Sequence, residues 1–345
     1  TRDLFRNFPR LDQEKSWDRI GGEGACESGG ENAGREGQVE EALGKDALGE
    51  DALGENALGK SALGENALGK NALVVRNLYK TFYSRRGLFG KAHPVKAVQD
   101  VSFTVRPGEV LGLIGGSGSG KTTVSRLILG LEKLDSGEIF LDGEAIHDLR
   151  GAERRRAAKK IHLVFQDPYQ SMRNTMSLFD IVAEPMIIQG GYSREEVQER
   201  VHAALKDVHL PQGERFLKRT PNQLSGGQRQ RLSFARAVVA RPRYIIADEP
   251  TSMLDVSLRQ ELLNLMEELR DRYQIGYIFI THDLSLAYHF CDRLLVMKEG
   301  VVVESAAARD LIHFPVHDYT RELISAVETP VLIPRISEEL SSVYA

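Results

Sequence analysis

The sequence predicts an α/β fold, and three observations support this prediction. From residue 73 onward, β-branched and apolar residues recur in short runs typical of strands. One of these runs, 109–114, leads directly into the glycine-rich segment 115–122, which is followed by an apolar helix pattern. Farther along, the apolar strand pattern 244–247 ends in two acidic residues. Strands that lead into loops and helices in this way are typical of α/β proteins.

Residues 1–71 precede these elements and are expected to form a disordered, low-complexity leader. From residue 42 to residue 71 the chain repeats a five-residue unit such as ALGKD or ALGEN. A five-residue step advances about 140° around a helix, so the leucines form no continuous stripe, and each glycine costs about 1 kcal/mol relative to alanine. A pentapeptide β-solenoid is the alternative, but alanine stands where that architecture places Asp or Asn.

Composition argues against several classes of protein. The 345 residues carry a net charge of −4, and residues 1–70 alone carry −6, so residues 71–345 sum to +2. A general binder of nucleic-acid backbones is therefore not expected. Cys26 and Cys291 are the only cysteines, so the sequence predicts neither a disulfide framework nor a cysteine zinc site. No run approaches the roughly 18 apolar residues of a membrane span. The first residue, Thr1, indicates a processed start or a fragment.

The first elements expected are strands at 73–78, 95–105 and 109–114. The third strand runs into a segment that matches G-x-x-x-x-G-K-[ST] between a strand and a helix. Glycines let successive backbone N–H groups turn toward a phosphate, the next helix offers its positive end, and a lysine adds a full charge. The pattern predicts a nucleoside triphosphate site. The residues expected to bind the nucleotide here are Gly115, Gly116, Ser117, Gly118, Ser119, Gly120, Lys121, Thr122 and Thr123.

The next chemical motif is the acidic pair at the end of strand 244–247. Asp248 is expected near a metal ion, together with the hydroxyl of Thr122, and Glu249 is expected where it polarises an attacking water. Paired acids also end strands without any function. The glycine-rich loop upstream favours the functional interpretation. The following helix, expected at 256–272, repeats its leucines at three- and four-residue spacing and predicts a core face.

Between the two motifs stands Leu224-Ser225-Gly226-Gly227-Gln228, and with it the chain resembles the ATP-binding subunits of ABC transporters. The resemblance covers about residues 73–329. It implies a P-loop NTPase ABC nucleotide-binding domain at 72–313, with a mixed sheet core, an antiparallel β subdomain and an α-helical subdomain at about 168–223. It also implies ATP and Mg²⁺ as ligands.

The resemblance further implies roles for individual residues. Gln166 would reach Mg²⁺ and the water, His282 would contact the γ-phosphate, and both would act with Glu249 in catalysis. Phe82 would stack on adenine, with Tyr83 as the close competitor. The remaining residues would meet the ATP of a second cassette across a dimer interface; these are Ser225, Gly226, Gly227, Gln228 and Asp255.

Three stretches narrow the resemblance to the second ATPase of oligopeptide and dipeptide importers. They are the first-hairpin insertion at 83–91, the phrase FQDPYQSM at 165–172 and the sequence FPVHDYTREL at 314–323. The segment 314–345 is accordingly expected to be a C-terminal tail of the oligopeptide-transporter type. Asp318 stands where these relatives have proline and Phe314 where they have asparagine, which leaves the docking of the tail open. Because Cys291 stands alone, an iron–sulfur cluster is not expected.

The resemblance thus implies a subunit that couples ATP hydrolysis to peptide import. Its partners would be a second ABC ATPase, identical or different, two permease subunits and, indirectly, an extracytoplasmic binding protein. The location would be the cytoplasmic face of a bacterial or archaeal membrane. Import of nickel chelates or other solutes, a cassette of an exporter, and a soluble ABC ATPase acting on ribosomes or DNA are the alternatives. No nucleic acid is expected, since the basic run 154–160 lacks interleaved aromatic residues and predicts a solvated helix face.

Overall fold

The computed structural model describes residues 71–85, 92–167 and 172–326. The prediction of a disordered leader concerns residues outside this described part, apart from residue 71. The same holds for parts of the hairpin insertion, of the FQDPYQSM phrase and of the tail. Among the described residues, no helix combines the length and the apolar character that crossing a membrane requires.

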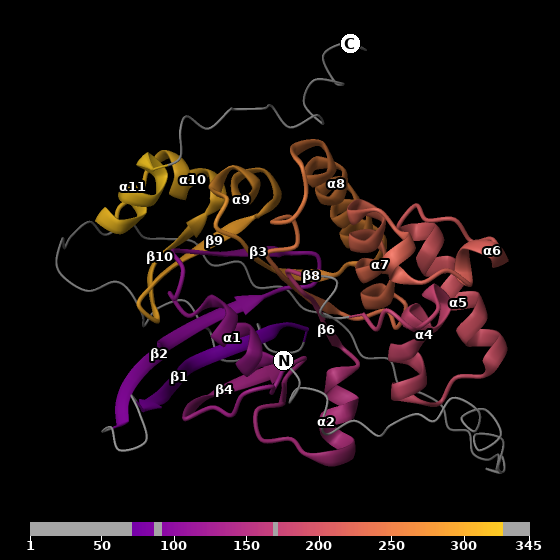
Figure 1. Cartoon of the computed structure of the whole chain (residues 1–345). Coiled ribbons are helices and arrows are strands. Elements are labelled where there is room, and N and C mark those ends of the chain that lie inside the picture. Colours follow the sequence, from indigo (N-terminus) through magenta and orange to yellow (C-terminus); the bar gives the residue numbers. More distant parts are fainter. Residues whose placement is uncertain (1–70, 86–91, 168–171, 327–345) are drawn as a thin grey trace, which may run out of the picture. The chain divides into compact units, whose positions relative to one another are not determined.

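A six-stranded mixed sheet forms the centre of the fold, in the order β10-β9-β3-β8-β7-β6 (Figure 1). Five strands are parallel to their neighbours, and β10 at the edge is antiparallel to β9. All five residues of β3 and of β8 are buried, as expected for parallel strands covered on both faces. The strands are β3 (Val110–Ile114), β6 (Ile161–Val164), β7 (Tyr244–Asp248), β8 (Gly276–Ile280), β9 (Arg293–Lys298) and β10 (Val301–Ala307).

A second, antiparallel sheet has the order β2-β1-β4-β5. Its strands are β1 (Leu73–Arg85), β2 (Ala92–Val105), β4 (Ser136–Leu141) and β5 (Glu144–Ala145). The first strand is longer than the predicted 73–78, because its pairing with β2 continues to Arg85. Leu73 and Leu78 of β1 are buried in one hydrophobic cluster with Leu113 of β3 and Leu127 of the helix that follows β3. This shared core joins the antiparallel sheet to the central sheet.

Among the described residues, a group of helices lies beyond the β6 edge of the central sheet (Figure 1). They are α4 (Leu178–Gln189), α5 (Arg194–Asp207), α6 (Glu214–Leu217), the 3₁₀ helix η2 (Pro221–Gln223) and α7 (Gly226–Val238). Each of the three long helices begins after a serine whose hydroxyl accepts a hydrogen bond from the backbone three residues on, which supplies one of the acceptors that a helix N-terminus lacks. Helix α7 contacts α4, α5 and β6, and so connects the helical group to the sheet.

The remaining helices flank the sheets. They are α1 (Lys121–Ile128), α2 (Gly151–Ala158), α8 (Val256–Tyr273), α9 (Leu284–Phe290), α10 (Ala308–His313) and α11 (Asp318–Ser325). The predicted core face of α8 is confirmed, since Leu262, Leu265, Met266 and Leu269 are buried. The expected mixed sheet, antiparallel β subdomain and helices are therefore all present.

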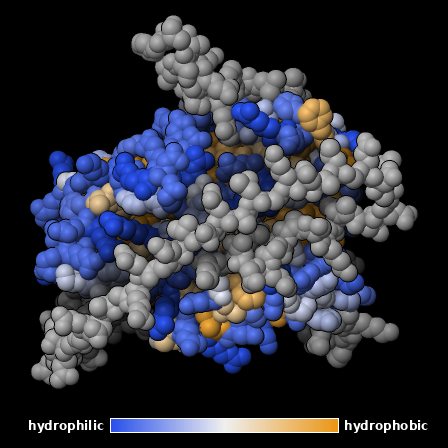
Figure 2. All heavy atoms as spheres, turned by 180° about the vertical axis from the view of Figure 1, so that it is seen from behind, coloured by the Kyte–Doolittle hydropathy of each residue, from blue (hydrophilic) through white to orange (hydrophobic). Residues whose placement is uncertain are grey.

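The surface seen from behind is mainly hydrophilic where the chain is described, and its apolar residues stand in small separate groups (Figure 2). The basic run 154–160, which lies on α2 and just after it, is solvated only in part. Arg156 is exposed as expected, but Lys160 pairs with Asp142 at 3.0 Å. The guanidinium of Arg154 is packed so closely on Gly130 that an added Cβ there would lie 2.3 Å from its Nη2 atom. Packing thus removes part of the run from solvent.

Candidate active site

Four neighbouring strands of the central sheet bring the predicted site residues to one edge. Lys121 follows β3, His282 follows β8, Asp248 and Glu249 lie at the end of β7, and Gln166 follows β6. Because these strands are parallel, their carboxyl ends lie at the same edge of the sheet, where ligands of α/β proteins bind. The order β3-β8-β7-β6 therefore gathers residues that are far apart in the chain.

The phosphate loop between β3 and α1 depends on its glycines. Gly115, Gly118 and Gly120 have φ values of 148°, 78° and 105°, which disfavour residues with a side chain. A Cβ at Gly115 would lie 2.2 Å from the carbonyl oxygen of Met297, and one at Gly120 would lie 2.3 Å from that of Ala97. Both the conformation and the close approach of neighbouring backbone therefore require glycine at these two positions.

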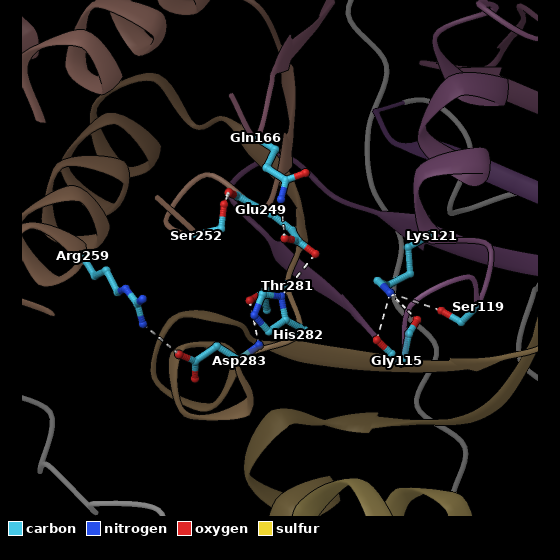
Figure 3. Close-up of polar contacts among 11 residues, drawn as sticks. Gly115, Ser119, Lys121, Gln166, Glu249, Ser252, Arg259, Thr281, His282 and Asp283 are labelled. Carbon is cyan, nitrogen blue, oxygen red and sulfur yellow. Dashed lines mark hydrogen bonds and ion pairs between the residues drawn. The ribbon is translucent and has the colours of Figure 1, made fainter. Parts of the chain in front are cut away.

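Lys121 is the cation of this loop. Its side chain is buried, and Nζ donates to the carbonyl oxygens of Gly115 and Gly116, both at 2.9 Å, and to Ser119 Oγ at 3.2 Å (Figure 3). Burial lowers the pKa of Lys121, whereas the charges of the two acids at the end of β7 act to raise it. A held ammonium group thus lies close to the acidic pair and inside the loop that is predicted to bind phosphate.

Asp248 lies next to the hydroxyl of Thr122. Burial raises the pKa of Asp248, while a hydrogen bond with Thr122 and the charge of Lys121 act in the opposite direction. Two of the three residues predicted to hold a metal ion are therefore in contact, and both present oxygen atoms. Oxygen ligands of this kind are those that Mg²⁺ prefers, so the residues fit the predicted ion.

Glu249 is held at both its backbone and its side chain. It adopts a φ of 47°, its N–H donates to the carbonyl oxygen of Ile280 at 2.9 Å, and its own carbonyl accepts from Ser252 Oγ at 3.0 Å. Its carboxylate accepts from Gln166 Nε2 at 2.9 Å and lies 3.2 Å from His282 Nδ1 (Figure 3). The structure thus places both of the other predicted catalytic residues, Gln166 and His282, in contact with Glu249. A carboxylate oriented by two neighbours is suited to accept a proton from water.

The backbone around His282 is fixed by residues that the sequence reasoning missed. Asp283 accepts from the amides of Ser285 and Leu286 and so caps α9, and its own N–H donates to Thr281 Oγ1 at 3.0 Å. Its carboxylate also lies 3.6 Å from Arg259 of α8 (Figure 3). An aspartate directly before a helix is a capping signal that the sequence displays. Nothing in the sequence marks Arg259 on α8 as the partner of Asp283.

The predicted signature residues form a second group, at the start of α7. The Ser225 hydroxyl accepts from the Gln228 N–H, and the Gln228 side chain accepts from the Ser225 N–H. This capping box leaves Gly226 and Gly227 as first-turn residues, whose N–H groups have no acceptor within the helix. Such amides at a helix N-terminus favour an anion.

The start of α8 lies beside this group. A Cβ at Gly227 would lie 3.2 Å from Leu258 Cδ2, so the first turns of α7 and α8 are in close contact. Asp255 caps α8 by accepting from the N–H of Leu258, and it is exposed. The structure therefore brings Asp255 near the signature residues, and their role at a dimer interface stays a prediction.

The two aromatic candidates for adenine stacking lie on β1. Phe82 pairs with Val95 of β2, and Lys80 Nζ lies 5.2 Å from the centroid of its ring. Its neighbour Tyr83 is 73% exposed, compared with 37% for Phe82. Both rings are exposed and so can be reached by a ligand, and the choice of Phe82 over Tyr83 stays a prediction.

One contact with the phosphate loop comes from the C-terminal part of the chain. The hydroxyl of Tyr319 accepts a hydrogen bond from the N–H of Gly116 at 2.9 Å. The sequence displays Tyr319 only as part of FPVHDYTREL, with nothing to indicate this partner.

Comparison with known proteins identifies the family of this chain. The family model described as ABC transporter matches residues 98–252. The chain is 41% identical over 256 residues to the oligopeptide transport ATP-binding protein OppF of Streptococcus mutans. The aligned residues cover 74% of this chain and 81% of that relative. It is 42% identical over 257 residues to the oligopeptide transport ATP-binding protein AppF of Bacillus subtilis, covering 74% and 78%.

Solved structures show the same fold. A dimeric structure of the bacterial ABC transporter cassette MJ0796 matches with a TM-score of 0.60 and 32% identity, over 69% of this chain and 99% of that one. The structure of cbiO1 from Clostridium perfringens matches with a TM-score of 0.61 and 28% identity, over 78% and 98%. With its phosphate loop, acidic pair and signature helix in place, the chain belongs to the ABC transporter family and is one of its ATP-binding, ATP-hydrolysing subunits.

Proposed function

We propose that this ATPase drives the import of peptides. The observation that carries the proposal is the similarity, at about 40% identity over three quarters of the chain, to relatives named oligopeptide transport or peptide import ATP-binding proteins. The tail sequence FPVHDYTREL and the phrase FQDPYQSM support the same assignment. The alternatives are import of nickel chelates, import of other solutes, and export, and uptake measurements distinguish them from peptide import.

Within one chain, the loop amides and Lys121 bind the phosphates of ATP. Thr122, Asp248 and Gln166 would hold Mg²⁺, which when bound neutralises phosphate charge and orients the terminal phosphate. Glu249 then accepts a proton from the attacking water. The hydrogen bond from Gln166 and the contact with His282 keep the Glu249 carboxylate aimed at that water, so its orientation costs no reorganisation during the reaction.

A second cassette completes each site. The first-turn amides of Gly226 and Gly227, with the Ser225 hydroxyl, are suited to the γ-phosphate of ATP held by the partner. Asp255 lies next to them and would cross the interface, and Phe82 would stack on the adenine. Stacking of this kind contributes about 0.5–1.5 kcal/mol beyond the burial of the ring. The similar cassette MJ0796 has been solved as a dimer, which supports the pairing of two cassettes.

The proposed organisation of the chain follows from these roles. Residues 72–313 form the cassette, the helical subdomain at about 168–223 meets the permeases, and 314–345 form the tail. The protein then works as a peripheral subunit at the cytoplasmic face of the membrane, with two permeases and an extracytoplasmic binding protein. Its partner cassette is a second copy or a related chain.

The test is uptake by a strain of the native host in which this gene is disrupted. Uptake of a labelled tripeptide should be lost, restored by the wild-type chain and not restored by Lys121→Ala, while nickel uptake stays unchanged. Affinity purification of the full chain from membranes in mild detergent should recover permeases and a binding protein. Unchanged peptide uptake, loss of nickel uptake, or recovery of ribosomes or DNA-repair proteins in place of permeases would contradict the proposal.

A further inference from the structure

Helix α11, the last helix of the described residues, reaches the phosphate loop through one side chain. Tyr319, in the first turn of α11, accepts a hydrogen bond from the N–H of Gly116, a residue 203 positions earlier in the chain. The approach is close, because a Cβ at Gly116 would lie 3.1 Å from the Tyr319 hydroxyl oxygen. None of the catalytic steps described above involves Tyr319, so the contact calls for its own explanation.

The bonded N–H belongs to the same peptide unit as a carbonyl that holds Lys121. In a planar trans peptide, the N–H of one residue and the C=O of the residue before it point in opposite directions and turn together. Here the Gly116 N–H is held by Tyr319, and the Gly115 carbonyl accepts from Lys121 Nζ at 2.9 Å. Holding one end of this unit therefore orients the other. Glycines on both sides leave the unit free to rotate unless something outside the loop fixes it.

The structure docks Tyr319 firmly enough to act in this way. The buried Glu304 carboxylate of β10 accepts from the N–H groups of Val316 and His317, at 2.8 and 3.0 Å. His317 Nδ1 in turn accepts from the Tyr319 N–H at 3.1 Å and caps α11. Lys298 Nζ lies 4.6 Å from the centroid of the Tyr319 ring. The turn before the helix, the helix start and the ring each have a defined partner.

Aspartate at position 318, where the resembling peptide importers have proline, is compatible with this docking. Asp318 is the first residue of α11, where proline is favoured by its fixed φ and aspartate by the positive end of the helix dipole. The other departure, Phe314, is 77% exposed and lies outside the contacts that hold the tail. The described segment 314–326 therefore docks with the residues that this chain has.

We propose that Tyr319 is a positioning residue for the phosphate loop. Through the Gly115–Gly116 peptide unit it holds the carbonyl that orients Lys121, and so the docked segment 314–326 sets the affinity of the cassette for nucleotide. The inference rests on ATP binding by the wild-type chain. That binding is measured first, so failure of the underlying activity is distinguishable from failure of the proposal.

The test is the conservative variant Tyr319→Phe in the full chain, which removes the hydroxyl and keeps the ring. The matched control is Tyr288→Phe, since the contact of the Tyr288 hydroxyl, at 3.2 Å, is with the exposed His313 and not with a residue of the phosphate loop. We expect Tyr319→Phe to weaken binding of a fluorescent ATP analogue about two- to tenfold, the range for one lost hydrogen bond. The KM for ATP should rise with kcat nearly unchanged, because the contact serves binding in ground and transition state alike. Tyr288→Phe should match the wild type.

A double-mutant cycle separates positioning from general stability. If Tyr319 acts through Lys121, its replacement should have little further effect on nucleotide affinity in a Lys121→Ala background. Glu304→Gln, which loosens the docking at a distance from the loop, should weaken nucleotide binding in the same direction as Tyr319→Phe. The proposal is overturned if Tyr319→Phe binds ATP as the wild type does, if Tyr288→Phe shows an equal loss, or if the full effect of Tyr319→Phe persists without Lys121.

Discussion

Replacing Glu249 by glutamine removes a proton acceptor and a negative charge while the shape of the side chain is kept. The carboxylate has two neighbours, Gln166 Nε2 at 2.9 Å and His282 Nδ1 at 3.2 Å. A glutamine keeps an oxygen for Gln166 and presents an N–H to His282 when that ring is protonated at Nε2. The φ of 47° is equally acceptable to both residues, so we expect the local structure to persist.

The expected effect on hydrolysis follows from the chemistry that is lost. A positioned general base contributes about 10²- to 10⁴-fold to a rate, or roughly 2.7–5.4 kcal/mol of activation free energy. We expect kcat to fall by that factor. The affinity for ATP should be retained or rise, because Lys121 and the loop amides remain and a negative charge near the phosphates is removed.

The assay is phosphate release by the full chain over a range of ATP concentrations, together with equilibrium binding of a fluorescent ATP analogue. Glu144→Gln, at an exposed position on β5, provides the same chemical change away from the site. Turnover of Glu249→Gln at the wild-type rate would refute the assignment of the base. A loss of ATP binding as large as the loss of turnover would show that Glu249 serves binding instead.

Three further predictions follow from the packing and the pattern of the chain. Gly120→Ala should destabilise the fold and weaken ATP binding more than Gly118→Ala does. Both glycines have positive φ, but only a Cβ at Gly120 would meet backbone, the carbonyl oxygen of Ala97 at 2.3 Å. Chemical denaturation and ATP titration compare the two variants, and equal losses would contradict the reasoning. Burial lowers the pKa of His162 to about 4 in the folded chain, compared with 6.5 in the unfolded chain. Between these two pH values the unfolded chain binds a proton that the folded chain does not bind. The free energy of unfolding therefore decreases as the pH falls below 6.5. At pH 5 the free energy of unfolding measured in denaturant should be lower by about 2 kcal/mol in the wild type, and this decrease should be absent in His162→Gln. If the wild type and the variant instead lose stability in parallel as the pH falls, His162 is not the source of the decrease. Removal of residues 1–71 should leave the ATPase rate within about twofold, because the five-residue repeat has no apolar face to pack; a truncated chain that fails to fold would show otherwise.

Several features of the site were predictable because their chemistry requires certain residues at fixed short spacing. The segment Gly115–Thr122 cannot bind phosphate without glycines that adopt unusual φ values and a lysine at the helix start, and the structure shows both. The acidic pair Asp248 and Glu249 likewise ends a buried strand, and the capping box of Ser225 and Gln228 opens a helix. Local rules dictate each of these, and the resemblance to a family added Gln166 and His282.

The sequence alone therefore determined the α/β class, the phosphate loop, the acidic pair and the signature helix. Only the tertiary structure decided how they meet: the strand order β3-β8-β7-β6 that puts Gln166 and His282 on either side of Glu249, the pairing of Arg259 with Asp283, and the contact of Tyr319 with Gly116. The reason is physical. Strand order and the docking of a terminal helix depend on burial and hydrogen bonding between residues far apart in the chain, and the periodicity of one segment carries no information about its distant partner.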